Sequence, residues 1–343
     1  MNLILTSVCN RKCSFCFAKE FVTNSKEEIM DFDFLKKIID ETMTLCNSPV
    51  FNLLGGEPTK YPYFVEMMDY IYEGYKKVRD SGDLEKLSIL PRICVTSNFL
   101  IDDDNVREVI KKVAHEFPKK VAFLLNISEA SQEQVERISK EVENCIKPES
   151  NVSLSFTVNN TFEYYKKILD LSYAKIIKPR QEKNKNSTTI RMSAVNPQPN
   201  SEISFDEYME KENEKTFNVF DQFVEWCVDH RTTINFDCGI TYCMLDDEKR
   251  EYYRRWSTDK MFNGCGGSAF DIFPNGDISK CYPGSLVKSN YYKYDKLIPC
   301  YEEIDIRTSI IRKDKKRMPK KCSTCPHFMK ECSGACIGFH NTK

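Results

Sequence analysis

The sequence predicts an α/β protein, namely a partial (β/α)6 TIM-type barrel followed by a cysteine-rich C-terminal domain. Strand-like and helix-like segments alternate over residues 1–236, which is typical of parallel strands joined by helical crossovers. Six repeats favour a barrel or partial barrel over a short open sheet, although periodicity alone does not separate the two. Over residues 237–343, cysteine, glycine, proline and charged residues become dense and no long helical period continues. We therefore expect two domains, 1–236 and 237–343.

The expected strands are short apolar runs rich in β-branched and aromatic residues. They cover residues 3–6, 50–54, 93–97, 121–127, 152–158 and 188–192. Helical spacing predicts helices over residues 32–45, 63–79, 105–117, 132–145 and 162–171, and one long helix over 205–230. Barrels of this kind carry their chemistry at the carboxyl ends of the strands, so site residues are expected there.

The composition excludes several classes of partner. The 343 residues include 50 Lys and Arg against 51 Asp and Glu, so the net charge of −1 gives no electrostatic reason to expect nucleic acid or a membrane surface. No apolar run approaches the ~20 residues of a membrane-spanning helix. The N-terminus has no basic segment before its short apolar run, so it is a poor signal peptide. We expect a cytoplasmic protein.

The chain contains 16 cysteines. Because the chain is large and has no export signal, clustered thiols indicate metal binding or catalysis more than disulfides. One group lies near the N-terminus and nine cysteines lie between Cys238 and Cys336. The other four stand singly in apolar or helical surroundings and are expected to be small buried hydrophobic residues: Cys46, Cys94, Cys145 and Cys227.

The first group, Cys9, Cys13 and Cys16, directly follows the first predicted strand. Three thiols on one short loop can converge on a single metal centre and leave one coordination position open, which catalysis requires and a structural site avoids. The alternatives are a zinc site completed by a distant Cys or His, or an ordinary loop.

The CxxxCxxC spacing, with Phe15 just before the last cysteine, resembles the signature of the radical S-adenosylmethionine (radical SAM) superfamily. The resemblance covers roughly residues 1–236. It implies that Cys9, Cys13 and Cys16 hold a catalytic [4Fe–4S] cluster whose fourth, open iron is chelated by S-adenosylmethionine. It also implies that Phe15 packs near the adenine.

Gly55, Gly56 and Glu57 end the second predicted strand. Paired glycines let a ligand approach the backbone closely, and a glutamate can accept hydrogen bonds from a cation. The alternative is a glycine turn with a solvated Glu57. The segment closely resembles the family's GGE motif, which implies that it binds the methionine ammonium of the cofactor.

Polar residues also stand at or near the ends of the later strands. The segment Thr96-Ser97-Asn98 resembles the family's TNG segment, and relatives have a serine near the ribose where the fourth strand ends. The resemblance implies further cofactor contacts from Ser97, Asn98, Asn126, Ser128, Thr157 and Arg191.

A second field of cysteines follows. Cys265, Gly276 and Cys281 form a Cys-x10-Gly-x4-Cys pattern, and residues 274–277 predict a hairpin turn that brings Cys265 and Cys281 together. Residues 322–336 then read Cys-x2-Cys-x6-Cys-x3-Cys. This is a soft-metal domain, with a structural zinc ribbon as the alternative. The basic run 312–321 before it is expected to be a solvated loop.

The second field is similar to the SPASM extension of radical SAM enzymes, which carries auxiliary [4Fe–4S] clusters. The resemblance implies a first auxiliary cluster on one set of thiols, namely Cys265, Cys281, Cys336 and either Cys238 or Cys243. It implies a second on Cys322, Cys325 and Cys332, whose fourth ligand could be Cys300, His340, a substrate thiol or nothing. Six residues instead of the usual five precede Cys332, and no cysteine follows Cys336. One auxiliary cluster only is the alternative.

The resemblance implies an enzyme that reductively cleaves S-adenosylmethionine to a 5′-deoxyadenosyl radical, which abstracts hydrogen from a substrate. A ribosomally made peptide is the expected substrate, with crosslinking, thioether formation or oxidation as the outcome. A flavodoxin- or ferredoxin-type donor would supply electrons. The chain begins directly at the first strand, so a separate leader-binding protein is one expected partner.

Two other functions stay open from the sequence. One is dehydrogenation of a small molecule or sulfatase-maturase-like oxidation of a protein side chain. The other, of a different class, is a non-catalytic iron–sulfur electron-transfer or zinc-binding protein.

Overall fold

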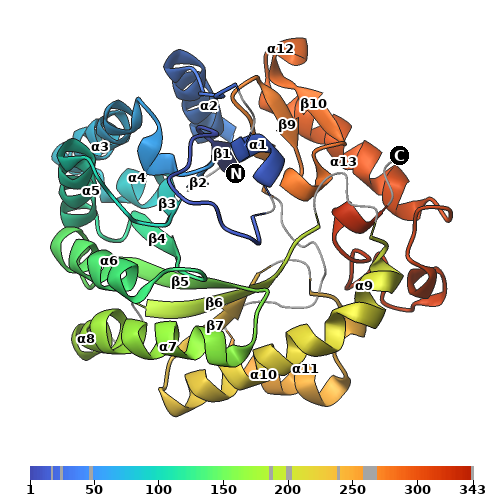
Figure 1. Cartoon of the computed structure of the whole chain (residues 1–343). Coiled ribbons are helices and arrows are strands. Elements are labelled where there is room, and N and C mark those ends of the chain that lie inside the picture. Colours follow the sequence, from blue (N-terminus) through green and yellow to red (C-terminus); the bar gives the residue numbers. More distant parts are fainter. Residues whose placement is uncertain are drawn as a thin grey trace.

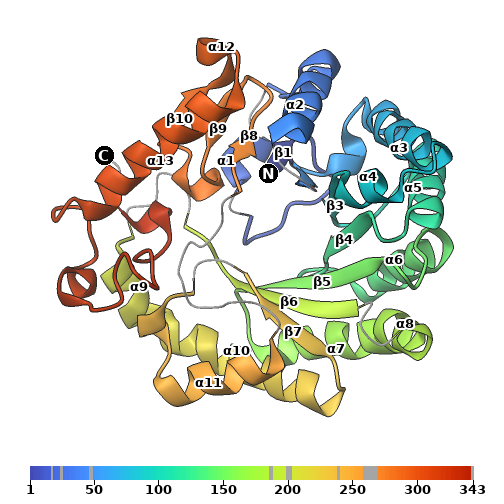
Figure 2. The same cartoon turned by 180° about the vertical axis from the view of Figure 1, so that it is seen from behind.

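The computed structural model describes residues 1–16, 18–23, 26–45, 49–184, 188–197, 203–237, 240–257 and 269–340. Within these residues one sheet runs through the molecule in the strand order β10-β9-β8-β1-β2-β3-β4-β5-β6-β7 (Figures 1 and 2). Its strands are β1 Asn2–Ile4, β2 Val50–Leu54, β3 Arg92–Ser97, β4 Val121–Asn126, β5 Asn151–Val158, β6 Thr188–Ala194, β7 Thr233–Phe236, β8 Asp271–Ile272, β9 Asp277–Ser279 and β10 Lys288–Asn290.

Strands β1 to β7 pair in chain order, and every one of these pairs is parallel. This confirms the α/β fold with helical crossovers, and each of the six predicted strands is present. The structure adds β7, a four-residue strand that the sequence analysis did not predict. Its shortness explains the omission, because four residues carry little alternation.

Helices cover the outer side of the curved sheet, as Figure 1 shows for α3, α5, α6 and α7. The α-helices are α1 Lys19–Thr23, α2 Phe32–Leu45, α3 Phe64–Asp80, α4 Leu84–Ile89, α5 Asp104–Glu116, α6 Gln132–Cys145, α7 Phe162–Ser172, α8 Lys178–Lys183, α9 Phe205–Lys211, α10 Asn213–Asp229, α11 Asp247–Trp256, α12 Tyr291–Tyr294 and α13 Leu297–Lys313. The predicted bounds of α2 and α6 match the structure, those of α3 and α5 are displaced by one residue at both ends, and α7 is one residue longer than predicted.

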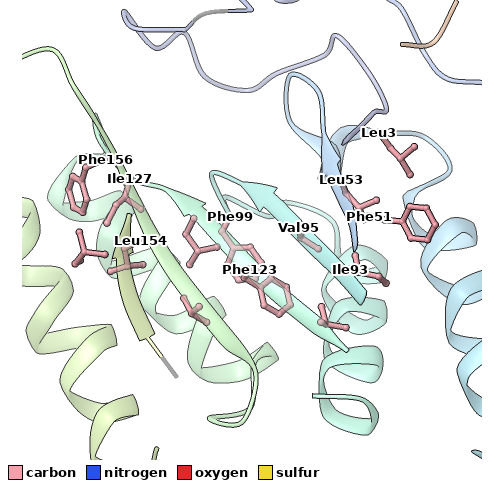
Figure 3. Close-up of a cluster of buried hydrophobic side chains, with 14 of the residues drawn as sticks. Leu3, Phe51, Leu53, Ile93, Val95, Phe99, Phe123, Ile127, Leu154 and Phe156 are labelled. Atoms are coloured by element: carbon pink, nitrogen blue, oxygen red, sulfur yellow. The ribbon is translucent and has the colours of Figure 1, made fainter. Parts of the chain in front are cut away.

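The main hydrophobic core lies between the sheet and these helices. Leu3, Phe51, Leu53, Ile93 and Val95 alternate along β1, β2 and β3 and are almost completely buried (Figure 3). Burying each such side chain contributes about 1.5–3 kcal/mol to stability before entropy is counted. Strand alternation then places the residues between them on the opposite, inner face of the sheet.

The inner face is polar where β8, β1 and β2 meet. Asn2 Nδ2 donates to Asp271 Oδ1 at 2.6 Å, and Asn52 Nδ2 donates to Asn2 Oδ1 at 2.7 Å. Cys94 lies on this face, one position from Ile93, and is half-buried. The expectation that Cys94 is a small buried hydrophobic residue is therefore wrong, whereas Cys145 and Cys227 are buried as expected. Cys46 lies outside the described residues.

The C-terminal region continues the same sheet. Strand β8 pairs parallel with β1, and β9 pairs antiparallel with both β8 and β10. The predicted hairpin turn is confirmed, since Phe273 N donates to Asp277 O at 2.9 Å and Gly276 N to Phe273 O at 3.0 Å. Gly276 has φ of +80°, a conformation that suits glycine.

Three expectations about helices and loops are wrong. The long helix predicted over residues 205–230 is divided into α9 and α10 at Glu212. The C-terminal region does contain helices, including the 17-residue α13. Its helical period is hard to see because Ile306 and Ile310 are exposed while Ile304 is buried. The basic run is not wholly a solvated loop, because Arg312 lies in α13 and is only 5% exposed.

In the described part of the chain, no helix is long and apolar enough to cross a membrane.

Candidate functional site

The loop that carries Cys9, Cys13 and Cys16 runs from the carboxyl end of β1 to α1, and all three cysteines are half-buried. Cys16 N donates to Cys13 O at 3.3 Å and Lys19 N donates to Cys16 O at 3.2 Å, so the loop turns directly into the helix. Arg11 N lies 3.4 Å from Cys9 Sγ and donates to it. The three thiols therefore belong to one short, internally bonded loop.

Residues from the ends of β4 and β5 hold this loop. Arg11 Nη1 donates to the carbonyl oxygen of Asn126 at 2.9 Å. Glu129 accepts hydrogen bonds from both the backbone N, at 3.0 Å, and the hydroxyl of Ser14, and Asn159 Nδ2 donates to Ser14 Oγ at 2.8 Å. The sequence analysis missed Glu129, although a carboxylate just after a strand end could have indicated it.

Gly55 and Gly56 lie against the backbone that leads into the cysteine loop. Gly56 N donates to Thr6 O at 2.7 Å, and Glu57 N donates to Val8 O at 2.8 Å. A Cβ atom on Gly55 would lie 2.4 Å from Thr6 O, and one on Gly56 would lie 2.4 Å from Val8 O. The close approach that these glycines permit is thus made by the chain itself.

Glu57 is 1% exposed, so it is not the solvated residue of a simple glycine turn. Its Oε1 accepts from Thr59 N at 3.1 Å, Thr59 Oγ1 at 2.8 Å and Ser97 Oγ at 2.7 Å, and its Oε2 accepts from Asn98 N at 2.8 Å. Burial raises the pKa of the Glu57 carboxyl, and these hydrogen bonds act in the opposite direction. Three of these four hydrogen bonds end on Oε1 and one ends on Oε2, so Oε2 keeps acceptor capacity for a cation.

The thiols and Glu57 fit an iron centre chemically. Burial raises the pKa of the Cys9 thiol to about 11, with Glu57 adding to the rise, and burial also raises the pKa of Cys13 and Cys16. A positive metal centre replaces such protons, since cysteine binds metal as the thiolate. Among the described residues, no group of three or more His, Cys, Asp or Glu is arranged to hold a metal ion as it stands.

Other predicted contacts link neighbouring strand ends to each other. Ser128 Oγ accepts from Thr157 N at 2.8 Å, and Ser193 Oγ donates to Thr157 Oγ1 at 3.0 Å, which joins β4, β5 and β6. Arg191 on β6 pairs with Asp237, just after β7, at 2.5 Å. These side chains therefore shape the carboxyl edge of the sheet.

Two other predicted residues lie beside the same edge. Phe15 is half-buried within the cysteine loop, and Asn126 takes part through its backbone carbonyl oxygen. Ser97 and Asn98 meet Glu57, as described above, and Asn98 Nδ2 also donates to Asn10 Oδ1 in the cysteine loop at 2.7 Å. The structure thus brings the predicted residues of β1 to β4 to one place.

The hairpin of the second cysteine field lies next to the first cysteine loop. The Tyr282 hydroxyl accepts a hydrogen bond from Phe21 N at 3.3 Å. Phe21 and Tyr282 pack with Phe273, and Cys16 packs against this cluster. The residue after Cys281 therefore reaches the helix that follows the first thiols.

Cys281 and Cys336 precede two short turns, Tyr282–Gly284 and Ile337–Phe339, which contact each other. The other thiols expected in the first auxiliary cluster, Cys238 and Cys265, lie outside the described residues. Their position relative to Cys281 stays a prediction.

Cys322, Cys325 and Cys332 line one pocket, and Cys243 lines it with them. Burial raises the pKa of the Cys322 thiol to about 12, and the neighbouring Cys243, Cys332 and Cys325 thiols add to the rise. The resemblance implies either Cys238 or Cys243 as a ligand of the first auxiliary cluster. The structure places Cys243 with the thiols expected in the second.

The two protein side chains expected as the fourth ligand there are engaged elsewhere. The buried Cys300 thiol in the first turn of α13 donates to Lys296 O at 3.3 Å. His340 Nε2 lies 2.5 Å from Gly334 O, and burial lowers the pKa of this imidazole to about 4. Neither residue is among those that line the pocket in the described part of the chain.

The comparisons with known proteins agree with this geometry. Residues 3–141 match the model of the Radical SAM superfamily. The matched part of the chain holds the first cysteine loop and Glu57. No curated protein matches the sequence.

Among solved structures, native anSMEcpe with bound AdoMet and Cp18Cys peptide has a similar fold. The TM-score is 0.53, the two sequences are 16% identical, and the match covers 100% of this chain and 91% of that chain. At this identity the similarity shows the fold, and it confirms the predicted partial barrel with a C-terminal extension.

Proposed function

We propose that this protein is a radical SAM enzyme that modifies a ribosomally made peptide. The observation that carries the proposal is the loop of Cys9, Cys13 and Cys16 held against the buried Glu57 at the carboxyl edge of a parallel sheet. Such an edge is where barrel enzymes place their reacting groups. The superfamily domain supports the radical chemistry, and the peptide in the structure of similar fold supports the substrate class.

Three thiolates would hold three irons of a [4Fe–4S] cluster and leave the fourth to S-adenosylmethionine. When bound, this pair of groups supplies a 5′-deoxyadenosyl radical that abstracts hydrogen from an unactivated C–H bond. The chain's own residues bind and orient the cofactor. Glu57, fixed by four donated hydrogen bonds, presents its free acceptor position to the cofactor ammonium.

The polar edge of the sheet would position the rest of the cofactor. In this proposal Ser97, Asn98, Asn126, Ser128 and Thr157 surround its adenosyl part, while Phe15 packs near the adenine. Several of these residues are already hydrogen-bonded to each other or to the loop, so they need little reorganisation to bind. Preorganisation of this kind reduces the cost of reaching a near-attack geometry.

We also propose one or two auxiliary [4Fe–4S] clusters in the C-terminal region, held by the second field of cysteines. The contact of Tyr282 with Phe21 supports an electron path between the two regions, because it brings Cys281 close to the first cysteine loop. A flavodoxin- or ferredoxin-type donor would supply the first electron. A separate leader-binding protein remains a proposed partner.

The test of the radical chemistry needs no substrate. The protein is reconstituted without oxygen, mixed with S-adenosylmethionine and dithionite, and assayed for 5′-deoxyadenosine by mass spectrometry, with Cys16→Ala as the control. Deoxyadenosine from the wild type alone supports the proposal. Zinc in place of iron at the first three thiols, with no deoxyadenosine formed, would favour the non-catalytic alternative.

The peptide proposal has its own test, since dehydrogenation of a small molecule uses the same cofactor. A small cysteine- or aromatic-rich open reading frame beside the gene is expected. Incubation of its product with the reconstituted enzyme should give a mass loss of about two hydrogens for each bond formed. An unchanged peptide, with deoxyadenosine formation stimulated by an alcohol or amino sugar, would favour the small-molecule reaction.

A further inference from the structure

We propose that Cys243 is a ligand of a [4Fe–4S] cluster that it shares with Cys322, Cys325 and Cys332. The inference rests on the auxiliary clusters proposed above and assigns the fourth ligand of one of them. Cys243 lies 79 or more positions away from the other three cysteines, so sequence spacing alone does not group the four. The inference is drawn from the structure, in which all four residues line one pocket.

The four cysteines come from two segments that meet at the pocket. Cys243 lies in the short turn Tyr242–Met244, which follows β7. Cys322 lies in the turn Lys320–Thr324, Cys325 directly follows it, and Cys332 pairs with Phe328 through an isolated bridge. Cys322 and Cys332 are buried, Cys325 is half-buried and Cys243 is exposed. The pocket is thus accessible from solvent on the Cys243 side.

Aromatic stacking holds the Cys243 turn against the cysteine-rich loop. The rings of Tyr242 and His327 stack with their centroids 4.6 Å apart and an interplanar angle of 13°. The Arg250 guanidinium lies 5.1 Å from the centroid of the Tyr242 ring and donates to the carbonyl oxygens of Tyr242 and Leu245. These contacts therefore hold the turn that carries Cys243 beside the loop that carries the other thiols.

The number of thiols around the pocket suits a cluster. Four of the residues that line it are cysteines, and four thiolates saturate a [4Fe–4S] core.

The surroundings suit a negatively charged thiolate cluster. Gly334 N donates to Cys332 Sγ at 3.4 Å, and hydrogen bonds to cluster sulfurs are a normal means of stabilising them. Lys321 lines the pocket. The buried Arg312 donates to the carbonyl oxygens of Ser333 and Ala335 and so fixes a second positive charge beside the loop.

A functional consequence follows from full ligation by protein. A cluster bound by four cysteines has no open iron, so it can pass electrons but cannot bind a substrate thiol or amine directly. Cys243 would therefore restrict this cluster to electron transfer, and substrate chemistry would stay at the open iron of the first cysteine loop.

The experiment uses the full chain with Cys9, Cys13 and Cys16 all changed to alanine, which removes the first cluster and leaves the auxiliary ones. Cys243→Ala, Cys322→Ala and Cys300→Ala are added to this background one at a time. Each protein is reconstituted without oxygen, and iron, sulfide and the EPR spectrum are measured. Circular dichroism compares their folding.

We expect Cys243→Ala to match Cys322→Ala, with the loss of between one and about four irons per chain and the EPR signal of a three-iron cluster or no cluster. Cys300→Ala, which removes a thiol outside the pocket, should leave the iron content unchanged. Cys243→His should keep iron and raise the reduction potential, as histidine ligation does in other clusters. This rescue separates ligation from folding.

Retention of iron and of the EPR spectrum in Cys243→Ala, together with iron loss in Cys322→Ala, would overturn the assignment of Cys243. A background protein that binds no iron would overturn the auxiliary clusters themselves. Neither result touches the radical chemistry, which the deoxyadenosine assay of the wild type tests separately.

Discussion

A Cβ atom on Gly56 would lie 2.4 Å from the carbonyl oxygen of Val8, closer than non-bonded atoms can approach. The two backbones also share the hydrogen bond from Glu57 N to Val8 O. Since Val8 directly precedes Cys9, this contact sets where the cysteine loop leaves β1. The glycines of the GGE segment thus act on the metal site through the chain, in addition to any contact with a cofactor.

Gly56→Ala should disturb this contact. The new methyl group meets backbone atoms, Val8 O at 2.4 Å and Ser7 O at 2.6 Å, which cannot rotate away as the end of a side chain could. Overpacking of this kind costs about 1–3 kcal/mol. We expect a lower melting temperature and a lower iron content at the first cysteine loop, measured by calorimetry and by iron analysis in a background with the second cysteine field mutated.

Gly74→Ala is the matched control. Gly74 lies in the exposed face of α3, and nothing lies within 4 Å of the position of its Cβ. Alanine there should stabilise the protein by roughly 0.4–1 kcal/mol, because it restricts the unfolded chain. Equal effects of the two substitutions would contradict the role assigned to Gly56.

Glu57→Gln tests the cofactor-binding role of the buried carboxylate. The amide keeps the shape of the side chain but loses the charge. It also replaces one oxygen with an NH2 donor, which cannot accept the hydrogen bonds that Thr59, Ser97 and Asn98 donate. A charged hydrogen bond contributes about 1.5–3 kcal/mol, so affinity for S-adenosylmethionine should fall about 10- to 150-fold. Equilibrium dialysis of the reconstituted protein measures this.

Glu41→Gln makes the same chemical change at a second hydrogen-bonded carboxylate, on α2. Glu41 accepts from the Tyr291 hydroxyl at 2.9 Å and from Leu297 N at 2.7 Å. This variant should bind S-adenosylmethionine like the wild type. If Glu57→Gln also kept wild-type affinity, the GGE segment would have a structural role only.

Asp271 should make the stability of the fold depend on pH. Burial raises the pKa of its carboxyl to about 7, although Asn2 donates to it. The unfolded chain has the ordinary value near 3.9, so between these pH values the native state binds more protons and its stability falls as the pH rises. Stability is therefore highest below about pH 4, and the loss reaches on the order of 4 kcal/mol by about pH 7.

The measurement is urea denaturation of the wild type and Asp271→Asn from pH 4 to 8. The amide keeps an oxygen that can accept from Asn2 and carries no charge, so the variant should lack this part of the pH dependence. Asp277→Asn is the control, because the pKa of Asp277 is shifted in the opposite direction. Burial alone would raise the pKa of Asp277, but hydrogen bonds from Lys288 and Asn290 outweigh it and lower the pKa. Parallel pH curves for the wild type and Asp271→Asn would show that Asp271 is not the group responsible.

Much of the fold could be predicted because the strands are strongly patterned. The runs at residues 50–54 and 121–127 are almost wholly apolar, and the helices between strands show a clear 3.6-residue period. The short β7 and helix α13 could not be predicted in this way. In α13, exposed Ile306 and Ile310 stand beside buried Arg312, which reverses the usual placement of apolar and charged residues.

The residues of the site also divide into those that the sequence could predict and those that it could not. Cys9, Cys13, Cys16 and Glu57 could be selected because spacing and residue type limit what their chemistry can be. Glu129 was not found, and Cys243 was expected, with Cys238 as the alternative, in the first auxiliary cluster. The residues that these two side chains meet are remote in the sequence and are brought near by the sheet and its connections. Spacing identifies ligands within a loop, whereas grouping between loops depends on tertiary structure.

Arg312 links that tertiary structure to the second cysteine field, and its replacement should loosen the loop. The guanidinium donates to Ser333 O at 2.5 Å and to Ala335 O at 3.0 Å, and the side chain is buried at the end of α13. In Arg312→Met the aliphatic part of the side chain is retained while both carbonyl oxygens lose their donor. Hydrogen bonds to a charged group contribute about 1.5–3 kcal/mol, so a loss of this order is expected.

Hydrogen exchange of the backbone amides over residues 332–336 measures the effect directly. Exchange there should become faster by about one to two orders of magnitude in Arg312→Met, since 1.4 kcal/mol corresponds to a factor of ten. Arg307 lies on the same helix as Arg312, is exposed and donates to Lys288 O. Arg307→Met removes this donor and should leave the exchange of these amides unchanged. Unchanged exchange in Arg312→Met would mean that the loop is held by its other contacts, such as the one between His340 and Gly334.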